Sequence, residues 1–517
     1  MKTVAVMMGA TVIAKLLGML RGVLVARAYG TSWQANAFTA ATRLPLSVFD
    51  LFLSATILGC FVPVYNSFEE SANERCEEKA DRFASLFLNF IILACGILAL
   101  LGIVFAKPLV GLITNGLDTA TVALAVTLTR IMFPLVIFSG AAYTLVGVLQ
   151  SRGSFIAPAL ISALSNLGVI LYLVFFDASL GDKGIYGLAV AYLASWIIQL
   201  LVLIIPLWKK GFKYRLLLDF RNSSLRSALK MMPPIMVGSW LVPAGALIGQ
   251  YFAANIASHG ILDGATTVFD CALNLYVIIA GTLTYSICNY TFPNISRLSA
   301  DGDDVQLFET VRSGLASALF IAVPFMAAAT VLSGEGVAIV YMRGEFTADD
   351  AYNTARALRF ILPAIPFFSL GEMLSRVFFA KNQPRVPMYA ALVGILVNIF
   401  ASSSMLLLEV YDIGALGLAN ALGQIAAALT LTVFAAVRFK GLFNKEFIVK
   451  IVKILLGAVA VFLICAAFSH ILDSQPYTAS FITNVWKAGT IFLASALAYL
   501  LYAKLARINP TKRRMNV

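Results

Sequence analysis

Long apolar segments follow one another along almost the whole chain, and they constrain its fold more than any other feature. A helix needs about 20 mostly apolar residues to cross the hydrocarbon core of a bilayer. About fourteen segments reach this length: 5–28, 35–65, 83–106, 120–149, 156–176, 185–208, 232–254, 264–292, 307–333, 353–380, 386–408, 414–436, 450–470 and 484–505. Of all residues, 60% are hydrophobic and only 12% are charged. The chain is therefore predicted to be an all-α polytopic membrane protein with about fourteen transmembrane helices.

The first segment is expected to stay in the protein. Lys2 and the run TVAVMMGATVIA imitate the start of a secretory signal. However, the apolar pattern continues well beyond this run, and no small-x-small cleavage site precedes a polar start.

The loops between the segments alternate in basic content. One set includes KKGFKYRLLLDFRNSSLRSALK (209–230), RFKGLFNK (438–445) and the tail KLARINPTKRR (504–514). The alternate set, which includes DASLGDKG and SHILDSQPYT, has almost no Lys or Arg. Because positive loops stay on the cytoplasmic side, both termini are predicted to be cytoplasmic. The net charge of +12 comes from these short loops, so no nucleic-acid partner is expected.

An internal repeat is visible at a constant spacing. LTRIMFPLVIFSG (128–140) resembles ALRFILPAIPFFSLG (357–371), and this match places Pro134 on Pro363. The same offset in residue number places Pro158 on Pro387, and an offset larger by a single position places Pro63 on Pro293. Since six spans return the chain to the same side, the two halves share one orientation, as in transporters with a substrate path between parallel repeats. The predicted divisions are a six-helix lobe (1–208), a basic cytoplasmic linker (209–231), a second six-helix lobe (232–437), and two further helices with a basic tail (438–517).

The first segment contains three cations. Arg21 and Arg27 lie within LGMLRGVLVARAYG (17–30), and Lys15 lies just before it. Charge at membrane depth is expensive and marks a functional site by default. Arg27 lies near the outer end, where a simple snorkelling position is an equally good interpretation. Lys15 and Arg21 lie deeper, and the segment contains no acidic residue. A cationic cluster of this kind predicts an anionic substrate, and the planar fork of arginine suits a phosphate group.

Later segments carry further charges. Arg43 and Asp50 are seven residues apart, about two helical turns, so they share one face of the second segment. Asp270 lies in the eighth segment, and Glu372 with Arg376 forms an i,i+4 pair in the tenth that is expected to be structural. The predicted substrate-binding residues are therefore Lys15, Arg21, Arg27, Arg43, Asp50 and Asp270.

Motifs for catalysis or cofactor binding are absent from the sequence. There is no Walker, HExxH or G-x-S-x-G motif and no CxxC pair, and the two histidines lie far apart. Of six cysteines, only Cys76 is expected in a loop. We therefore expect neither an enzyme nor a cofactor or metal, and transport driven by the membrane potential, an ion gradient or a substrate gradient. A membrane-embedded transferase is a weaker alternative, because it would need clustered Asp or His, and a purely structural role is weaker still.

Several motifs together resemble one transporter family. LGMLRGVLVARAYG, ANAFTAATRLP and FVPVY are similar to the N-terminal signature of the MurJ lipid II flippases, in the multidrug/oligosaccharidyl-lipid/polysaccharide exporter superfamily. LQSRGSFIAPALISALSN, SGEGVAIVYMRGEFTADD and RVFFAKNQPRVP resemble later family segments, so the likeness covers about residues 10–440. It implies a bacterial cytoplasmic (inner) membrane, fourteen helices in two lobes, alternating access, and a groove for the lipid tail beside the last two helices. It also implies that Lys15, Arg21, Arg27 and Arg43 occupy the family's basic positions.

The chain departs from the family pattern at several expected site residues. Asn36 replaces an aspartate, Phe49 and Cys271 replace arginines, Ser54 replaces a glutamate and Gln383 replaces an aspartate. The seventh span has no acidic residue, which weakens any transfer of the family's sodium site. Losing one charge-assisted contact changes binding by about 1.5–3 kcal/mol.

The leading hypothesis is a flippase that moves lipid-linked peptidoglycan precursor (lipid II), with Lys15, Arg21 and Arg43 holding its diphosphate. The first alternative is a flippase for another polyprenyl-diphosphate-linked glycan, such as a capsule or exopolysaccharide unit. A drug/cation antiporter is a weaker alternative, because it would favour buried carboxylates over cations. The expected partners are the lipid-linked substrate and membrane lipids, and the sequence leaves the oligomeric state open.

Overall fold

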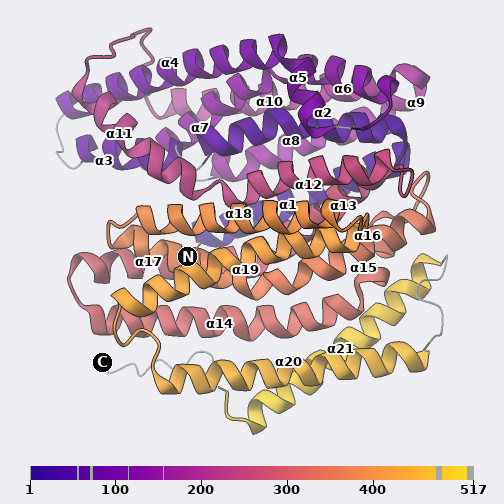
Figure 1. Cartoon of the computed structure of the whole chain (residues 1–517). Coiled ribbons are helices and arrows are strands. Elements are labelled where there is room, and N and C mark those ends of the chain that lie inside the picture. The colour runs from indigo at the N-terminus through magenta and orange to yellow at the C-terminus, as the bar shows by residue number, and fades with distance from the viewer. Residues whose placement is uncertain are drawn as a thin grey trace. The chain divides into compact units, whose positions relative to one another are not determined.

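The computed structural model describes residues 2–54, 57–69, 74–114, 116–154, 156–472 and 480–508, and in these ranges every regular element is a helix (Figure 1). The elements before residue 260 are α1 (Lys2–Tyr29), α2 (Trp33–Phe49), η1 (Asp50–Ser54), η2 (Ile57–Phe61), α3 (Val62–Glu69), α4 (Glu74–Val104), α5 (Ala106–Ile113), α6 (Thr119–Met132), α7 (Leu135–Ser151), α8 (Ile156–Phe175), α9 (Asp177–Leu180), η3 (Gly181–Lys183), α10 (Gly184–Lys209), α11 (Ser223–Gly238) and α12 (Leu241–Ser258). Those that follow are α13 (Ala265–Ala300), α14 (Asp304–Val331), α15 (Ser333–Tyr341), α16 (Ala348–Ile361), η4 (Leu362–Ala364), α17 (Ile365–Ala380), α18 (Arg385–Leu407), α19 (Ile413–Arg438), α20 (Lys445–Leu472) and α21 (Phe481–Leu505). The all-α prediction is confirmed.

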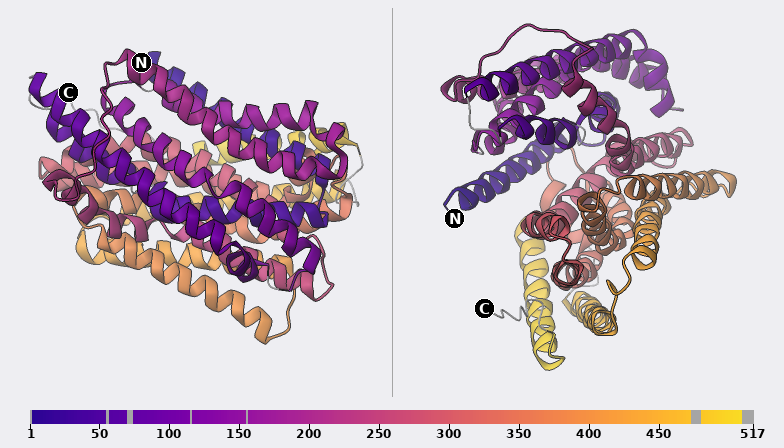
Figure 2. Two further views of the ribbon diagram at one scale, coloured as in Figure 1. Left: turned by 90° about the horizontal axis from the view of Figure 1, so that it is seen from above. Right: turned by 90° about the vertical axis from the view of Figure 1, so that its left-hand side faces the viewer.

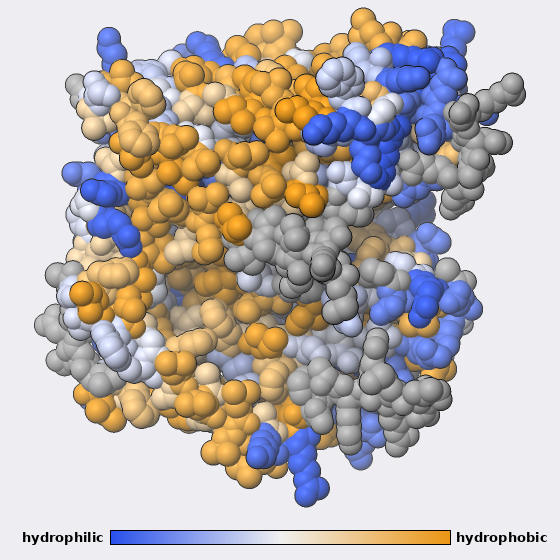
Figure 3. Space-filling view, turned by 180° about the vertical axis from the view of Figure 1, so that it is seen from behind, coloured by the Kyte–Doolittle hydropathy of each residue, from blue (hydrophilic) through white to orange (hydrophobic). Residues whose placement is uncertain are grey.

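Most of these helices have the length and composition of membrane spans. Among the described residues, eleven helices qualify, or twelve if the bent pair α11 and α12 counts as one span. Hydrophobic side chains also form much of the surface visible in Figure 3, as expected for a protein that faces lipid. Every predicted segment contains a helix or a pair of helices, but the count of fourteen membrane spans stays a prediction.

The chain forms two compact units, Met1–Thr267 and Val268–Val517. The core of the first unit is built from apolar side chains of α2, α4, α6, α7 and α10, with Phe61, Phe87 and Phe133 among the fully buried ones. In the second unit, α20 and α21 pack with α14 around Ile454, Cys465 and Ile491. The seventh predicted span, α11 and α12, lies within the first unit, and the four-part division stays a prediction.

Repeat-related positions have the same local structure in the two units. Pro134 separates α6 from α7, and Pro363 lies in the short turn η4 that separates α16 from α17. Gly153 after α7 and Asn382 after α17 both have positive φ, and their numbers differ by the same offset as the two prolines. Gly211 after α10 and Gly441 after α19, at nearly this offset, are also positive in φ, a backbone conformation that glycine adopts without strain. The turns therefore follow the spacing that the sequence predicts.

Candidate substrate-binding site

Helix α1 carries three of the predicted cations and is positioned by α8. The side-chain amide of Asn166 on α8 donates to the carbonyl oxygen of Ala14 at 3.2 Å. Gly18 lies against the same side chain, because a Cβ at this position would be 3.2 Å from the Asn166 amide nitrogen. At the other end of α1, the Tyr29 hydroxyl donates to Asp177 at 2.5 Å. These contacts fix the side of α1 that faces α8.

Arg21 stacks on an aromatic ring, and no carboxylate among the described residues pairs with it. Its guanidinium carbon lies 5.1 Å from the ring centroid of Tyr192 on α10. Tyr192 is buried, and Phe38 on α2 meets its ring edge-to-face at 6.1 Å. A cation over an aromatic face gains about 0.5–2 kcal/mol, depending on desolvation. The contact leaves the N–H donors of the guanidinium available to an anion.

Arg43 joins the same cluster from α2. It interacts electrostatically with both Tyr192 and Asp50. Asp50 also interacts with the phenol of Tyr143 on α7. The prediction that Arg43 and Asp50 share a helix face is thus consistent with the structure. We name Arg21, Arg43, Asp50, Tyr143 and Tyr192 the N-terminal polar cluster.

Regular α-helix ends at Asp50. Pro45 lies inside α2, where its ring removes one backbone donor, and two short π-helical segments, η1 and η2, follow from Asp50. In η1, the carbonyl oxygen of Leu51 accepts from the indole N–H of Trp240 at 2.8 Å. Trp240 lies at the 49° bend between α11 and α12. This hydrogen bond therefore joins the π-helical segment to the bend between α11 and α12.

The contacts of Asn36 show why an amide fits at a position where the family that this chain resembles has a carboxylate. Its Nδ2 donates to the carbonyl oxygen of Asp263 at 2.8 Å. Its Oδ1 accepts from the hydroxyls of Thr266 and Thr267 at 2.6 and 2.8 Å. An ionised aspartate has no donor for the carbonyl. The Asn36 amide therefore links the N-terminal part of α2 by hydrogen bonds to the start of α13 and to the loop before it.

Other predicted site residues are placed separately. Lys15 is half-buried and Arg27 is exposed, both on α1. Asp270 belongs to the second unit, where it accepts from the amide of Asn274, one turn later on α13, at 2.8 Å. The N-terminal polar cluster therefore contains three of the six predicted residues: Arg21, Arg43 and Asp50.

Two of the departures from the family pattern serve packing. Phe49 is buried and contacts the rings of Tyr143 and Trp196, with centroids 4.9 and 6.0 Å away. Cys271 is buried on α13. An arginine at either position would need a polar partner to offset its desolvation. Phe49 and Cys271 therefore fill these two buried positions with side chains that need no charged partner.

Two more sequence expectations have a structural outcome. Glu372 and Arg376 form the predicted i,i+4 pair at 3.9 Å, and Arg376 also lies over the ring of Phe292. Gln383 accepts from Arg438 at 2.6 Å, so it links the end of α17 with the end of α19. The side chains of Ser54 and Cys76, the loop 473–479 and the tail from residue 509 lie outside the described residues.

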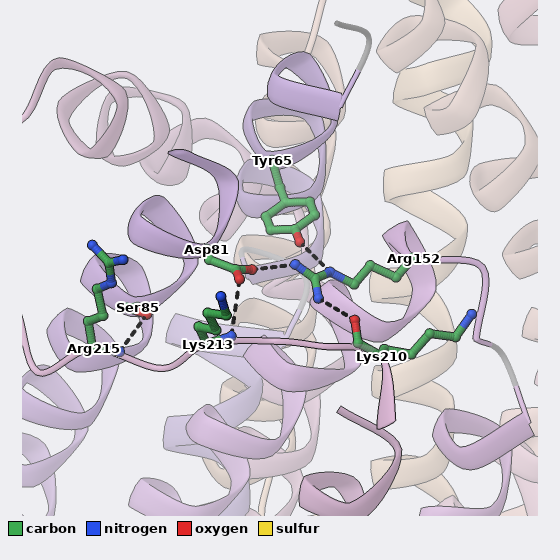
Figure 4. A network of polar contacts seen from close by, with 7 residues as sticks. All are labelled: Tyr65, Asp81, Ser85, Arg152, Lys210, Lys213 and Arg215. Carbon is green, nitrogen blue, oxygen red and sulfur yellow. Dashed lines mark hydrogen bonds and ion pairs between the residues drawn. The ribbon is translucent and has the colours of Figure 1, made fainter. Parts of the chain in front are cut away.

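Sequence reasoning missed a second polar network in the first unit (Figure 4). Arg152, after α7, pairs with Asp81 on α4, donates to the hydroxyl of Tyr65 at 2.9 Å and donates to the carbonyl oxygen of Lys210 at 2.9 Å. Asp81 in turn accepts from the backbone N–H of Lys213 at 3.0 Å. Asp81 and Arg152 are both nearly buried. The signal was an aspartate at the edge of an apolar segment.

A buried ion pair in the second unit was also missed. Lys487 on α21 lies 3.0 Å from Glu335 on α15, and the side chains are only 8% and 4% exposed. Beside it, Arg343 lies over the ring of Phe481 at 5.6 Å. A lysine within the last apolar segment was the available signal. This pair attaches the last helix to the body of the second unit.

The arrangement is suited to binding an anion. The N-terminal polar cluster presents two guanidinium groups, one carboxylate and two phenols, a set that matches phosphate oxygens and neighbouring hydroxyls. Across the residues that the structure describes, no group of three or more His, Cys, Asp or Glu side chains could hold a metal ion.

Comparisons with known proteins agree on one family. The family model described as "Lipid II flippase MurJ" matches residues 25–486. A "Probable lipid II flippase MurJ" of Bdellovibrio bacteriovorus is 27% identical over 407 residues, which are 77% of this chain and 75% of the relative. The "Lipid II flippase MurJ" of Burkholderia cenocepacia is 26% identical over 438 residues, with 84% and 83% covered.

Solved structures show the same fold. "Lipid II flippase MurJ, inward closed conformation" superposes with a TM-score of 0.76 at 22% identity and covers 97% of this chain and 98% of that one. The "Inward-facing conformation of a multidrug resistance MATE family transporter of the MOP superfamily" has a TM-score of 0.64 at 17% identity, with 85% and 98% covered.

Proposed function

Because this chain belongs to the MurJ lipid II flippase family, we propose that it moves lipid-linked peptidoglycan precursor across the cytoplasmic membrane for cell-wall synthesis. It is an integral membrane protein, and its family transports rather than catalyses. The proposal includes alternating access, cytoplasmic termini, and a reset driven by the membrane potential or an ion gradient. Moving one charge through 100 mV releases about 2.3 kcal/mol, enough to bias such a cycle.

The observation that carries the proposed mechanism is the stacking of Arg21 on Tyr192. A diphosphate needs several donors held in one place, and a guanidinium fixed by an aromatic face is oriented before the substrate arrives. Arg43 supplies a second guanidinium, which interacts electrostatically with Tyr192. Asp50 and Tyr143 then contact hydroxyl or amide groups of the attached sugar. Lys15, Arg27 and Asp270 are proposed to bind elsewhere on the headgroup or along its path.

A second substrate class is supported by one specific observation. Phe49 and Cys271 are packed in apolar surroundings where the resembling family has arginines. A site with fewer cations would suit another polyprenyl-diphosphate-linked glycan, whose sugar makes more of the contacts. A drug/cation antiporter is less well supported, because two guanidinium groups in the cluster would repel a cationic drug.

The test is rescue of a bacterium depleted of its own lipid II flippase. Wild type, Arg21→Ala and Arg27→Ala are expressed at matched membrane levels, and accumulated lipid II on each leaflet is measured beside growth. We expect wild type to rescue, and Arg27→Ala, which removes an exposed cation near the end of α1, to lose less transport than Arg21→Ala. Arg21→Ala is expected to lose tenfold or more of transport, since a charge-assisted contact contributes about 1.5–3 kcal/mol.

Each outcome has a distinct meaning. Rescue by Arg21→Ala would remove Arg21 from the substrate path while leaving the flippase proposal in place. Failure of a correctly inserted wild type would favour the second substrate class, which is then tested by rescue of a capsule-flippase mutant. Arg21→Lys separates charge from geometry, because lysine keeps the charge but loses the bidentate fork.

A further inference from the structure

An extended segment after α10 passes alongside the helices of the first unit (Figure 2, right). We call residues 210–220 the strap. It contains no regular secondary structure except the turn at its ends, yet its backbone is hydrogen-bonded at regular intervals to α4. Asp81 accepts from the N–H of residue 213 at 3.0 Å, and Ser85 accepts from the N–H of residue 215 at 3.1 Å.

The amide of Asn89 completes this ladder. It donates to the carbonyl oxygens of Arg215 and Leu217 at 3.1 and 2.9 Å, and its oxygen accepts from the Tyr214 hydroxyl at 2.7 Å. Four residues of helix rise about 6 Å, and two residues of extended chain rise about 6.6 Å. Polar residues four apart on α4 therefore match backbone groups two apart on the strap. These hydrogen bonds therefore fix the position of the strap along α4.

The strap carries large apolar side chains that are exposed, although the ring of Phe220 also meets Phe90 of α4 edge-on at 6.3 Å. Leu216 is 82% exposed, and Leu218 and Phe220 are just over half exposed. Trp208, at the end of α10, is 82% exposed as well. Apolar groups of this size on one short segment indicate a contact surface rather than a surface exposed to water.

The same stretch is strongly basic. Residues 209–230 contain seven Lys or Arg and one Asp. The lysines at 209, 210 and 213 and Arg221 are exposed. Arg215 forms a solvent-exposed pair with Glu78 at 2.7 Å. Exposed cations next to exposed leucine, phenylalanine and tryptophan are typical of a segment that lies in the headgroup layer of an anionic leaflet.

The height of the strap along α4 agrees with this environment. Its ladder partners run from Asp81, in the charged first turns of the candidate span Glu77–Val104, to Asn89 in the apolar part of that helix. Eight residues of helix correspond to about 12 Å, so the strap follows α4 from its charged end into its apolar part.

The second unit has a different segment at the matching position. After α19, the chain makes a short turn at 439–444, and there Phe439 and Leu442 are buried. The strap therefore has exposed apolar side chains where the matching turn has buried ones. The repeat shared by the two units does not account for this exposure.

We propose that residues 208–221 bind the anionic headgroups of inner-leaflet phospholipids, with Leu216 and Leu218 inserted beneath the headgroups. The lysines and Arg221 contact the phosphates. This surface is separate from the N-terminal polar cluster, and it would recognise resident lipids rather than the transported substrate.

The depth of the strap is tested with a nitroxide spin label. Leu216→Cys is made in a Cys76→Ser background, because the other five cysteines are buried. The full-length protein is placed in phosphatidylglycerol/phosphatidylcholine bilayers, and Asp301→Cys in the same background reports an exposed loop. We expect the label at 216 to collide more with oxygen than with a water-soluble nickel chelate. Nickel access as high as at 301 would overturn the proposal and indicate a water-facing surface for a protein partner.

The headgroup preference is tested by direct lipid titration. Purified Lys209→Gln/Lys213→Gln protein is compared with Lys440→Gln/Lys445→Gln, a matched pair at the turn after α19. Native mass spectrometry measures retained phosphatidylglycerol and phosphatidylcholine. We expect phosphatidylglycerol to bind the strap variant about tenfold or more weakly, since each surface cation contributes to anionic-lipid binding, with phosphatidylcholine unchanged. Equal losses in both variants, or no preference for phosphatidylglycerol in wild type, would overturn it.

Discussion

The turn after α7 in the first unit and the repeat-related turn after α17 in the second unit are held by different interactions. In the first unit, Arg152 follows α7 and contacts Asp81, Tyr65 and the turn after α10. In the second unit, Lys381 occupies the repeat-related position after α17 and pairs with Asp304 at the start of α14. Asp81 is 8% exposed, whereas Asp304 is 56% exposed. One position in the repeat is thus a buried junction in one unit and a surface pair in the other.

The difference follows from what covers the pair. In the first unit, the strap lies over α4 and excludes water from Asp81. In the second unit, the junction is divided among separate contacts: Arg312 donates to the carbonyl oxygen of Gly441 at 2.8 Å, and Arg438 donates to Gln383. A single arginine can bridge three elements because its fork has five donors, whereas a lysine holds one point.

The largest expected effect comes from Asp81→Ala. Removing the carboxylate leaves Arg152 nearly buried without its charge partner, and breaking a buried pair in this way costs about 3–5 kcal/mol. The free energy of unfolding is measured in mixed detergent micelles with increasing denaturing surfactant. A loss below about 1 kcal/mol, the range of exposed pairs, would mean that water reaches the junction despite the strap.

Arg152→Lys should have an intermediate effect. Lysine can keep the ion pair but cannot also reach Tyr65 and the Lys210 carbonyl, so we expect a loss of about 2 kcal/mol. The converse change, Lys381→Arg, serves as the control and should be near neutral, because the position is more exposed. If both exchanges gave the same unfolding midpoint, the comparison between the two junctions would fail.

The smallest effect is expected for Asp304→Ala. A pair that is half in water contributes about 0–1 kcal/mol, and less at high salt. Unfolding at low and at high salt, about 0.05 and 0.5 M, distinguishes the two junctions, since the loss in Asp304→Ala should shrink with salt whereas that in Asp81→Ala should persist. A large, salt-independent loss of unfolding free energy in Asp304→Ala would contradict this comparison. It would show that the position in the repeat, rather than burial, determines how much the ion pair stabilises the protein.

Much of the fold follows from patterns that the sequence displays directly. Apolar length predicts the helices, and the constant offset of the repeat predicts the breaks at Pro134 and Pro363. The π-helical segments from Asp50 onward could not be predicted in this way, and the partner of one of their carbonyl groups, that of Leu51, is Trp240, which is 189 residues away. The strap was missed for a similar reason, since its order comes from polar side chains on α4.

The candidate site was predicted only in part. Charge in an apolar segment identifies Arg21 and Arg43, because an unpartnered cation is costly in lipid. Their aromatic partner, Tyr192, carries no such signal, since a tyrosine in a membrane helix is ordinary. The burial of Phe49 depends on the rings of Tyr143 and Trp196, which only the folded unit brings together.

The ladder between α4 and the strap also has a consequence for the order of events during synthesis. Asn89 and Leu217 are 128 residues apart. At about 5–20 residues per second, the ribosome needs roughly 6–25 s to make the chain between them. During that time Asp81, Ser85 and Asn89 are in the nascent protein before their partners exist. The third span therefore cannot reach its final hydrogen bonding when it first enters the membrane, and the first unit is completed only after the sixth span has been made.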